Sequence, residues 1–165
     1  MDPGWSPDGQ KIVFAESFPA TKREEIRILD LTTHRVSAIP GSNGTYSPRW
    51  SPNGRYIAVL GREAPFLRIF DVGTQRWSVL PTTSIVAFPC FSSDSQTIYF
   101  QRYGLDQGIF RIRISGGKEE RVLDMKDIHL TTFMSLSLDP TDAPLVLRDA
   151  GTHDVYALTL ERARN

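Results

Sequence analysis

The fold of this 165-residue chain is decided by one ten-residue stretch, Trp5-Ser6-Pro7-Asp8-Gly9-Gln10-Lys11-Ile12-Val13-Phe14. Three further copies follow at residues 50–59, 91–100 and 138–147, the last two eroded. In every copy a large apolar residue stands seven positions before an aliphatic one: 5 before 12, 50 before 57, 91 before 98 and 138 before 145. The copies begin 45, 41 and 47 residues apart. A repeat of that length made of short β runs is typical of a β-propeller with one blade per repeat.

Each repeat predicts four antiparallel strands, one before the motif and three after it. The strands before the motif are expected at 46–50, 86–91 and 132–138. Those after it are expected at 11–15, 25–31 and 35–39; at 55–60, 67–72 and 76–80; at 96–102, 109–114 and 120–123; and, in an incomplete last blade, at 144–148 and 155–160. We therefore predict an all-β fold, a single propeller domain over 1–165. Its repeats are expected at about 1–44, 45–84, 85–130 and 131–165.

The motif itself predicts a tight turn between two strands. Pro presets φ at the first turn position, Asp accepts a backbone hydrogen bond, and Gly adopts positive φ. Ser95 and Asp142 replace the Gly in the last two copies, so we expect those turns to be strained or changed and their blades less regular. Trp5, Trp50 and Phe91 lead the first three copies, and we expect them to anchor the packing between blades.

The composition excludes several classes of function. Nineteen Lys and Arg balance nineteen Asp and Glu, which gives no electrostatic reason to expect nucleic acid or anionic lipid as a partner. Cys90 is the single cysteine, so no intramolecular disulfide is expected. The chain begins without a signal-peptide pattern, and no run approaches the roughly 18 apolar residues of a membrane span. The cytoplasm is slightly favoured over the periplasm.

No catalytic or metal site is predicted, and no cofactor is expected. The Gly-x-Ser-x-Gly nucleophile elbow of a serine hydrolase does not occur. His34, His129 and His153 are scattered, without the spacing of a transition-metal site, and His34 is interpreted as a solvated turn residue. We therefore expect a protein that is not an enzyme.

Two further features have structural interpretations. The sequence around Asp139, Thr141 and Asp142 lacks the Gly and terminal Glu of a calcium loop, so it is interpreted as the fourth copy of the turn. Cys90 stands in a predicted strand beside Phe88 and Phe91, where a free cysteine behaves as a small buried hydrophobe.

The repeats resemble the TolB-type, Pro-Asp, WD-repeat-like propeller repeat. Trp-Ser-Pro-Asp-Gly before an apolar strand, and then an Ile-x-Ile-x-Asp strand, carry the resemblance, which is strongest over 5–35 and 50–80 and fades beyond 136. TolB pairs its propeller with a separate N-terminal domain, works in the bacterial periplasm and binds proteins without catalysis. Similar repeats precede the hydrolase domain of prolyl oligopeptidase-type peptidases. They also occur as C-terminal, sensor-like modules behind winged-helix or kinase domains. Residues 144–158 resemble the C-terminal ends of these proteins.

The resemblance implies a non-catalytic module for protein interaction or ligand sensing, expected here as the C-terminal part of a larger bacterial regulatory protein. The alternatives are the propeller of a prolyl oligopeptidase-like peptidase without its hydrolase domain, and a periplasmic TolB-like envelope protein. A small closed ring of four blades, an open arc, and two chains that close one larger ring all fit the repeat count. An open blade edge would favour self-association.

Partners of propellers bind where the loops that lead into the inner strands converge. These loops would present Tyr46, Arg49, Phe88 and Phe133, and aromatic and Arg residues are frequent anchors of interfaces. We predict these four residues as candidates for binding a protein partner or a small ligand, although each also suits ordinary packing of an inner strand.

Overall fold

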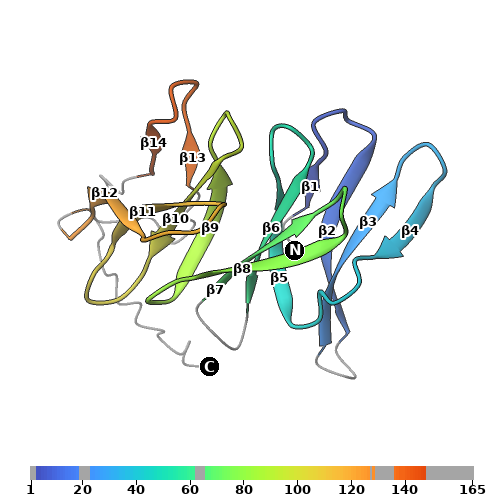
Figure 1. The fold of residues 1–165 in the computed structure, drawn as a ribbon, viewed down its shortest axis with the longest axis horizontal. Helices are drawn as coiled ribbons and strands as arrows, with labels where there is room; N and C mark the ends of the chain where they lie inside the picture. The colour runs from blue at the N-terminus through green and yellow to red at the C-terminus, as the bar shows by residue number, and fades with distance from the viewer. Residues whose placement is uncertain (1–2, 19–22, 62–65, 127, 129–135, 148–165) are drawn as a thin grey trace, which may run out of the picture.

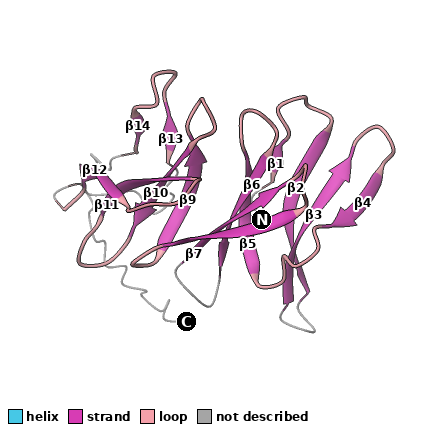
Figure 2. Ribbon diagram, in the orientation of Figure 1, coloured by secondary structure: helices cyan, strands magenta, loops and turns pink. Residues whose placement is uncertain are grey.

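The computed structural model of the chain describes residues 3–18, 23–61, 66–126, 128 and 136–147. Every regular element of these residues is a strand, and they contain no helix, as Figure 2 shows. The strands form three four-stranded antiparallel sheets and one two-stranded sheet, each built from consecutive strands. We number these sheets as blades 1 to 4 along the chain. The predicted all-β propeller architecture is confirmed.

The strands of blades 1 to 3 agree with the predicted plan of four per blade. Blade 1 consists of β1 (Gly4–Trp5), β2 (Lys11–Phe18), β3 (Arg23–Asp30) and β4 (Arg35–Ala38). Blade 2 consists of β5 (Thr45–Trp50), β6 (Tyr56–Gly61), β7 (Phe66–Asp71) and β8 (Arg76–Pro81). Blade 3 consists of β9 (Val86–Phe91), β10 (Thr97–Arg102), β11 (Gly108–Arg113) and β12 (Glu120–Asp124). Blade 4 is described by β13 (Ser137–Leu138) and β14 (Pro144–Leu145), and the strand predicted at 155–160 lies outside the described residues.

The described blades stand in an open row, with blade 1 at one end and blade 4 at the other (Figure 1). The turns between the first and second strand of all four blades lie on one side of the row, at the top of Figure 1; we call this the turn face. The loops that join one blade to the next, 39–44 and 82–85, lie on the opposite side, which we call the connection face.

The core consists of apolar layers between neighbouring blades. Blade 2 presents Trp50, Ile57, Val59, Phe70 and Val72 to Val13, Ala15, Ile26, Ile28 and Ile39 of blade 1. One blade further on, Phe91, Ile98, Phe100, Ile112 and Ile114 of blade 3 repeat this set against Ala58, Leu60, Leu67, Ile69 and Leu80 of blade 2. Both faces of each inner blade are therefore buried, which explains why the strands do not alternate strictly between apolar and polar residues.

The leading apolar residues of the second and third motifs pack against the preceding blade. Phe91 is 7% exposed in the layer between blades 2 and 3, and Trp50 packs into the layer between blades 1 and 2. These two packing predictions are confirmed. The same prediction is wrong for Trp5, which is 62% exposed because no described residue lies on that side of blade 1.

The turn of blade 3 keeps the geometry of those of blades 1 and 2, so Ser95 adopts the positive φ that glycine has there and carries the predicted strain. Gly9, Gly54 and Ser95 have φ of 70°, 72° and 60°, and their N–H groups all donate to the Ser carbonyl three residues earlier, at 2.9 Å. Ser95 is accommodated because its Oγ accepts a hydrogen bond of 3.1 Å from the Asn53 N–H of blade 2. The Gly position thus lies against the turn of the preceding blade.

The turn of blade 4 is changed, as predicted, and it is one residue shorter than the others. Leu138 pairs with Pro144, and the expected partner Leu145 pairs with Ser137 instead. Trp5, Trp50 and Phe91 all pair with the residue seven positions later. Because a shift of one residue reverses the two faces of a strand, Leu145 points away from blade 3 and is 51% exposed.

Candidate functional site

The predicted binding residues of the inner strands fill the layers between blades. Tyr46 lies in β5 and packs, half-buried, against the layer between blades 2 and 3. Phe88 lies in β9 and packs, half-buried, against the layer between blades 3 and 4. Arg49 is also half-buried, and its Nη1 donates to the Pro48 carbonyl at 2.9 Å. The structure therefore divides these side chains among different layers, and Phe133 lies outside the described residues.

A bulge in β5 and β9 determines where these side chains point. The strand register shifts between Tyr46 and Arg49, and again at the equivalent place in β9. Ser47 and Phe88 occupy the same position of the two bulges, with φ of 51° and 52°. Both precede a proline, and positive φ is uncommon for a residue with a bulky side chain. The Ser47-Pro48 and Phe88-Pro89 steps are the sequence signal that would have revealed the bulges.

The loop at 39–44 is held firmly on the connection face. The Ser42 Oγ accepts a hydrogen bond of 3.0 Å from the Ile26 N–H and donates to the Ile39 carbonyl at 2.7 Å. The Trp77 Nε1 donates to the Pro40 carbonyl at 2.7 Å, so the outer strand of blade 2 also ties this loop down. Loop 39–44 therefore has a fixed backbone.

The loop at 82–85 is fixed through a charged cluster between blades 2 and 3. Thr83 donates to Glu119 from both its N–H (3.1 Å) and its Oγ1 (3.0 Å). Glu119 also forms an ion pair with Arg102, and both side chains are only 8% exposed. The Arg102 guanidinium lies 3.6 Å from the centroid of the Phe110 ring, and burial lowers the pKa of Arg102. Asp106 completes the cluster through ion pairs with Arg102 and Arg121.

Two apolar side chains project from the loops that this cluster holds. Ile85 is 69% exposed and Leu105 is fully exposed. Their loops are joined because the Tyr103 N–H donates to the Ile85 carbonyl at 3.1 Å and the Ser84 Oγ donates to the Tyr103 carbonyl at 3.1 Å. We call Ile85 and Leu105 the apolar tip. Sequence analysis missed it because both residues lie in loops outside the repeat pattern.

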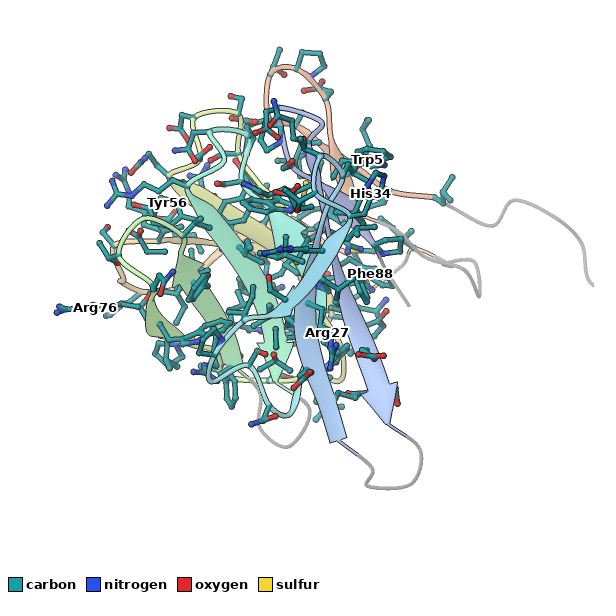
Figure 3. The ribbon with its side chains drawn as sticks, turned by 90° about the vertical axis from the view of Figure 1, so that its right-hand side faces the viewer. Trp5, Arg27, His34, Tyr56, Arg76 and Phe88 are labelled. Atoms are coloured by element: carbon teal, nitrogen blue, oxygen red, sulfur yellow. The ribbon has the colours of Figure 1, made fainter. Side chains whose placement is uncertain are left out.

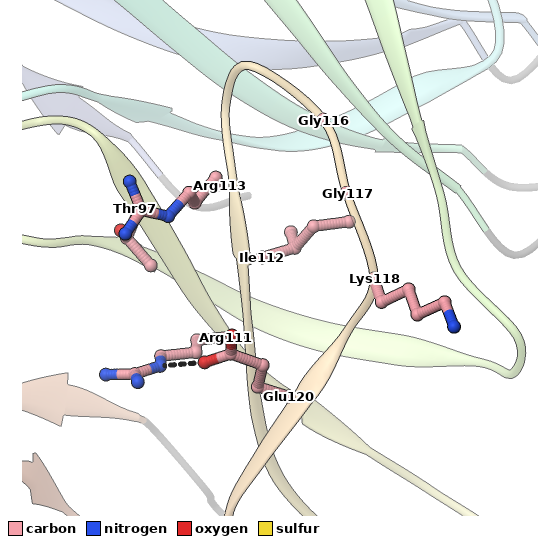
Figure 4. Close-up of a pocket in the computed structure, with 8 residues that line it drawn as sticks. All are labelled: Thr97, Arg111, Ile112, Arg113, Gly116, Gly117, Lys118 and Glu120. Atoms are coloured by element: carbon pink, nitrogen blue, oxygen red, sulfur yellow. Dashed lines mark hydrogen bonds and ion pairs between the residues drawn. The ribbon is translucent and has the colours of Figure 1, made fainter.

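Blade 3 also carries a polar hollow of about 250 Å³ (Figure 4). It is lined by Thr97, Arg111, Ile112, Arg113, Gly116, Gly117, Lys118 and Glu120. The Arg111 Nε donates to Glu120 Oε2 at 2.9 Å, and the hydrogen bonds that Arg111 donates to Tyr99 and Glu120 raise its pKa. Arg111 and Arg113 stand where blade 2 has Ile69 and Asp71, so blade 3 has two arginines at these positions of the face that looks toward blade 4.

The other residues considered for chemistry occupy structural positions. Among the described residues no group of three His, Cys, Asp or Glu side chains lies close enough to hold a metal ion. His34 is exposed in the turn after β3, as predicted. Cys90 is half-buried, and burial raises the pKa of its thiol. The Asp139 Oδ1 accepts hydrogen bonds from the N–H groups of Thr141 (2.7 Å) and Ala143 (2.9 Å), so this segment is a turn.

The described residues also contain no helix with the length and apolar character of a membrane span.

Comparison by sequence finds relatives that match part of the chain. No protein-family model matches the chain. It is 44% identical over 62 residues to the Tol-Pal system protein TolB of Alcanivorax borkumensis, an alignment that covers 36% of this chain and 14% of that protein. It is 34% identical over 117 residues to dipeptidyl-peptidase 5 of Porphyromonas gingivalis, which covers 60% of this chain and 17% of that protein. The chain thus spans less than a fifth of each of these two relatives.

Comparison by structure finds the same fold. TolB from Acinetobacter baumannii superposes with a TM-score of 0.68 at 22% sequence identity, over 85% of this chain and 35% of that one. The β-propeller domain of the trilobed protease from Pyrococcus furiosus, which has an open velcro topology, superposes with a TM-score of 0.53 at 22% identity, over 75% and 43% of the two chains. The row of meander blades is therefore a β-propeller architecture. More narrowly, the fold is similar to the β-propeller of TolB.

Proposed function

We propose that this chain is a protein-binding propeller module whose partner docks on the connection face, over Ile85 and Leu105. The observation that carries the proposal is the exposure of these two large apolar side chains on loops that are otherwise firmly held. Apolar side chains on rigid loops are effective anchors, because little conformational entropy is lost when they are buried. The likeness to TolB, which is named as a protein of the Tol-Pal system, supports a protein as the partner.

The residues beside the apolar tip indicate which kind of partner surface would fit it. Asp106 and Arg121 are half-exposed beside the tip and form an ion pair with each other. A partner that fits would have an apolar pocket for Leu105, with polar groups of both signs at its rim. Since the net charge of the chain is zero, specificity would come from this local pattern and not from long-range steering.

A capture experiment with matched variants tests this function. Leu105→Asp and Ile85→Asp place a charge at the tip without touching a buried residue. Val79→Asp makes the same change at a side chain of β8 that is 56% exposed and is not part of the tip. A partner identified by mass spectrometry should bind the unmodified chain and Val79→Asp, and should be lost with both tip variants. Equal recovery with all four proteins would refute the docking surface.

The propeller of a peptidase is the second candidate, supported by the 34% identity with dipeptidyl-peptidase 5 over 60% of the chain. In that case this chain would have no peptidase activity of its own and would cover a hydrolase domain of the same protein. Sequencing the natural gene product distinguishes the two, since only a peptidase carries an adjoining segment with a Gly-x-Ser-x-Gly elbow.

We also propose the cytoplasm as the compartment and a regulatory protein as the context, as the sequence favours. The single half-buried thiol of Cys90 is compatible with reducing conditions. An immunoblot of fractionated source cells tests both proposals. Detection in the periplasm would support an envelope role instead.

A further inference from the structure

The outward face of blade 1 has apolar residues at the positions with which blade 2 packs against blade 1. The strand pairings make Trp5, Ile12, Phe14, Leu29, Leu31 and Val36 equivalent to Trp50, Ile57, Val59, Phe70, Val72 and Trp77 of blade 2. All six positions in blade 1 are apolar. We call these six residues the leading face; Figure 3 looks at this end of the row and labels Trp5.

No described residue of the chain covers the leading face. Ile57 and Val59 of blade 2 are 0% exposed, whereas Ile12 and Phe14 are only half-buried. Trp5 and Val36 are 62% and 48% exposed. Monomeric proteins rarely expose so continuous an apolar surface, and such a surface usually marks an interface.

The other end of the described row is also apolar, but there it is the face that a blade turns toward the next blade. Leu145 and Leu147 occupy the positions that each blade directs toward the next one, equivalent to Tyr99 and Gln101 of blade 3. They are 51% and 55% exposed. We call this pair the trailing face. The corresponding faces of neighbouring blades already meet three times within the described residues, in the layers between blades 1 and 2, 2 and 3, and 3 and 4.

We propose that the leading face docks the trailing face of a second copy of this chain, head to tail. The contact continues the packing between blades that the chain repeats internally, with Trp5 in the place of Trp50. The net charge of zero means that no electrostatic repulsion opposes the association of two copies. Because the two faces are different, the contact is heterologous and produces either a closed ring of copies or a longer series. This surface is separate from the apolar tip and does not depend on the proposed function.

Sedimentation equilibrium of the purified chain tests the proposal. The unmodified chain should show a mass above 18.6 kDa that rises with concentration. Trp5→Ser and Leu147→Ser should each weaken the association about tenfold or more, because each removes a large apolar side chain from one side of the contact. Val79→Ser, which alters an exposed residue of neither face, should associate like the unmodified chain.

A mixture of variants shows whether the contact is head to tail. Trp5→Ser retains the trailing face and Leu147→Ser retains the leading face, so mixing them should restore one strong contact and give a dimer. Circular dichroism of each variant verifies that it is folded. A chain that is monomeric at every concentration would refute the proposal. So would a Leu147→Ser variant that associates fully by itself, or a natural product in which a preceding blade of the same polypeptide covers Trp5.

Discussion

Gly9, Gly54, Ser95 and Asp142 occupy the same position of their turns, with φ of 70°, 72°, 60° and 64°. A Cβ built on Gly54 would lie 3.8 Å from Pro7 Cδ of blade 1, so a side chain at this position reaches the turn of the preceding blade. The side chain of Asp142 reaches the turn of blade 3 in this way. It accepts hydrogen bonds from the Ser93 N–H at 2.8 Å and from the Ser93 Oγ at 3.0 Å. The cost of positive φ in a residue other than glycine is offset by contacts between blades.

Replacement of Asp142 should therefore weaken the junction of blades 3 and 4. Asp142→Ala loses both hydrogen bonds and retains the positive φ, so we expect the free energy of unfolding to fall by about 1–2 kcal/mol. Asp142→Asn keeps an acceptor for the Ser93 N–H and tolerates the backbone, and it should lose less than about half of that. Urea denaturation measures both variants. Equal losses would contradict the role of the hydrogen bonds.

The sequence predicted the turns themselves, but not the hydrogen bonds that join the turns of neighbouring blades. The Ser-Pro-Asp-Gly string indicates its own φ angles, because they depend on local residues. The hydrogen bond between Asn53 and Ser95 joins residues 42 positions apart, and no local pattern contains it. Trp5 was misjudged for a related reason, since the repeat identifies the packing position but not whether a neighbour fills it.

The second prediction concerns the charged cluster between blades 2 and 3. Glu119 is buried against Arg102, and Glu119→Gln would leave the guanidinium with Asp106 as its remaining partner. We expect a loss of about 3 kcal/mol, since the buried guanidinium would then have only the half-exposed Asp106 as a counter-charge. Glu120→Gln is the matched control. Its ion pair with Arg111 is largely exposed and should be worth less than about 1 kcal/mol. Similar losses in the two variants would contradict the account.

Turn carboxylates make stability depend on pH. Hydrogen bonds, chiefly those donated by Ser6, Thr33, Thr74, Ser92 and Thr141, lower the pKa values of Asp8, Asp30, Asp71, Asp94 and Asp139 below the ordinary 3.8. A lowered pKa in the folded state gives stability that is present above about pH 4 and is lost as the pH falls through the folded value. The midpoint of urea denaturation should therefore decrease as the pH falls below about 4.

Blade 2 supplies the control for this dependence. Asn53 stands where blades 1 and 3 have Asp8 and Asp94, and it accepts the same hydrogen bonds, from the Ser51 Oγ at 2.7 Å and the Arg55 N–H at 3.0 Å. Asp94→Asn should thus fold normally and lose part of the decrease in acid. An unchanged acid profile would show that these carboxylates do not titrate with folding.

The strands were predicted closely, because periodicity and turn residues are local signals. The bulges at Ser47 and Phe88 and the shorter turn of blade 4 were not, since each alters the register by one residue in a way that spacing alone does not reveal. The binding roles of Tyr46, Arg49, Phe88 and Phe133 stay predictions. Tyr46 and Phe88 are divided between layers, and the apolar tip consists of residues in unpatterned loops.

Cohesion of the whole molecule comes from the layers between blades. Trp50 joins blades 1 and 2, whereas Trp5 is largely exposed. Trp50→Ala should lower the free energy of unfolding by about 3 kcal/mol, and Trp5→Ala by less than about 1 kcal/mol in the dissociated chain. Thermal denaturation at low protein concentration measures both. Equal effects would show that Trp5 is covered by the chain itself.

The most direct test of the central claim is photo-crosslinking from the apolar tip. A photoreactive residue would replace Leu105 in one sample and Val79 in another, in the cells that make the protein. The account predicts a protein adduct from position 105 and none of the same mass from position 79. Absence of an adduct at 105, or the same adduct from both positions, would contradict the claim that the connection face binds a protein partner.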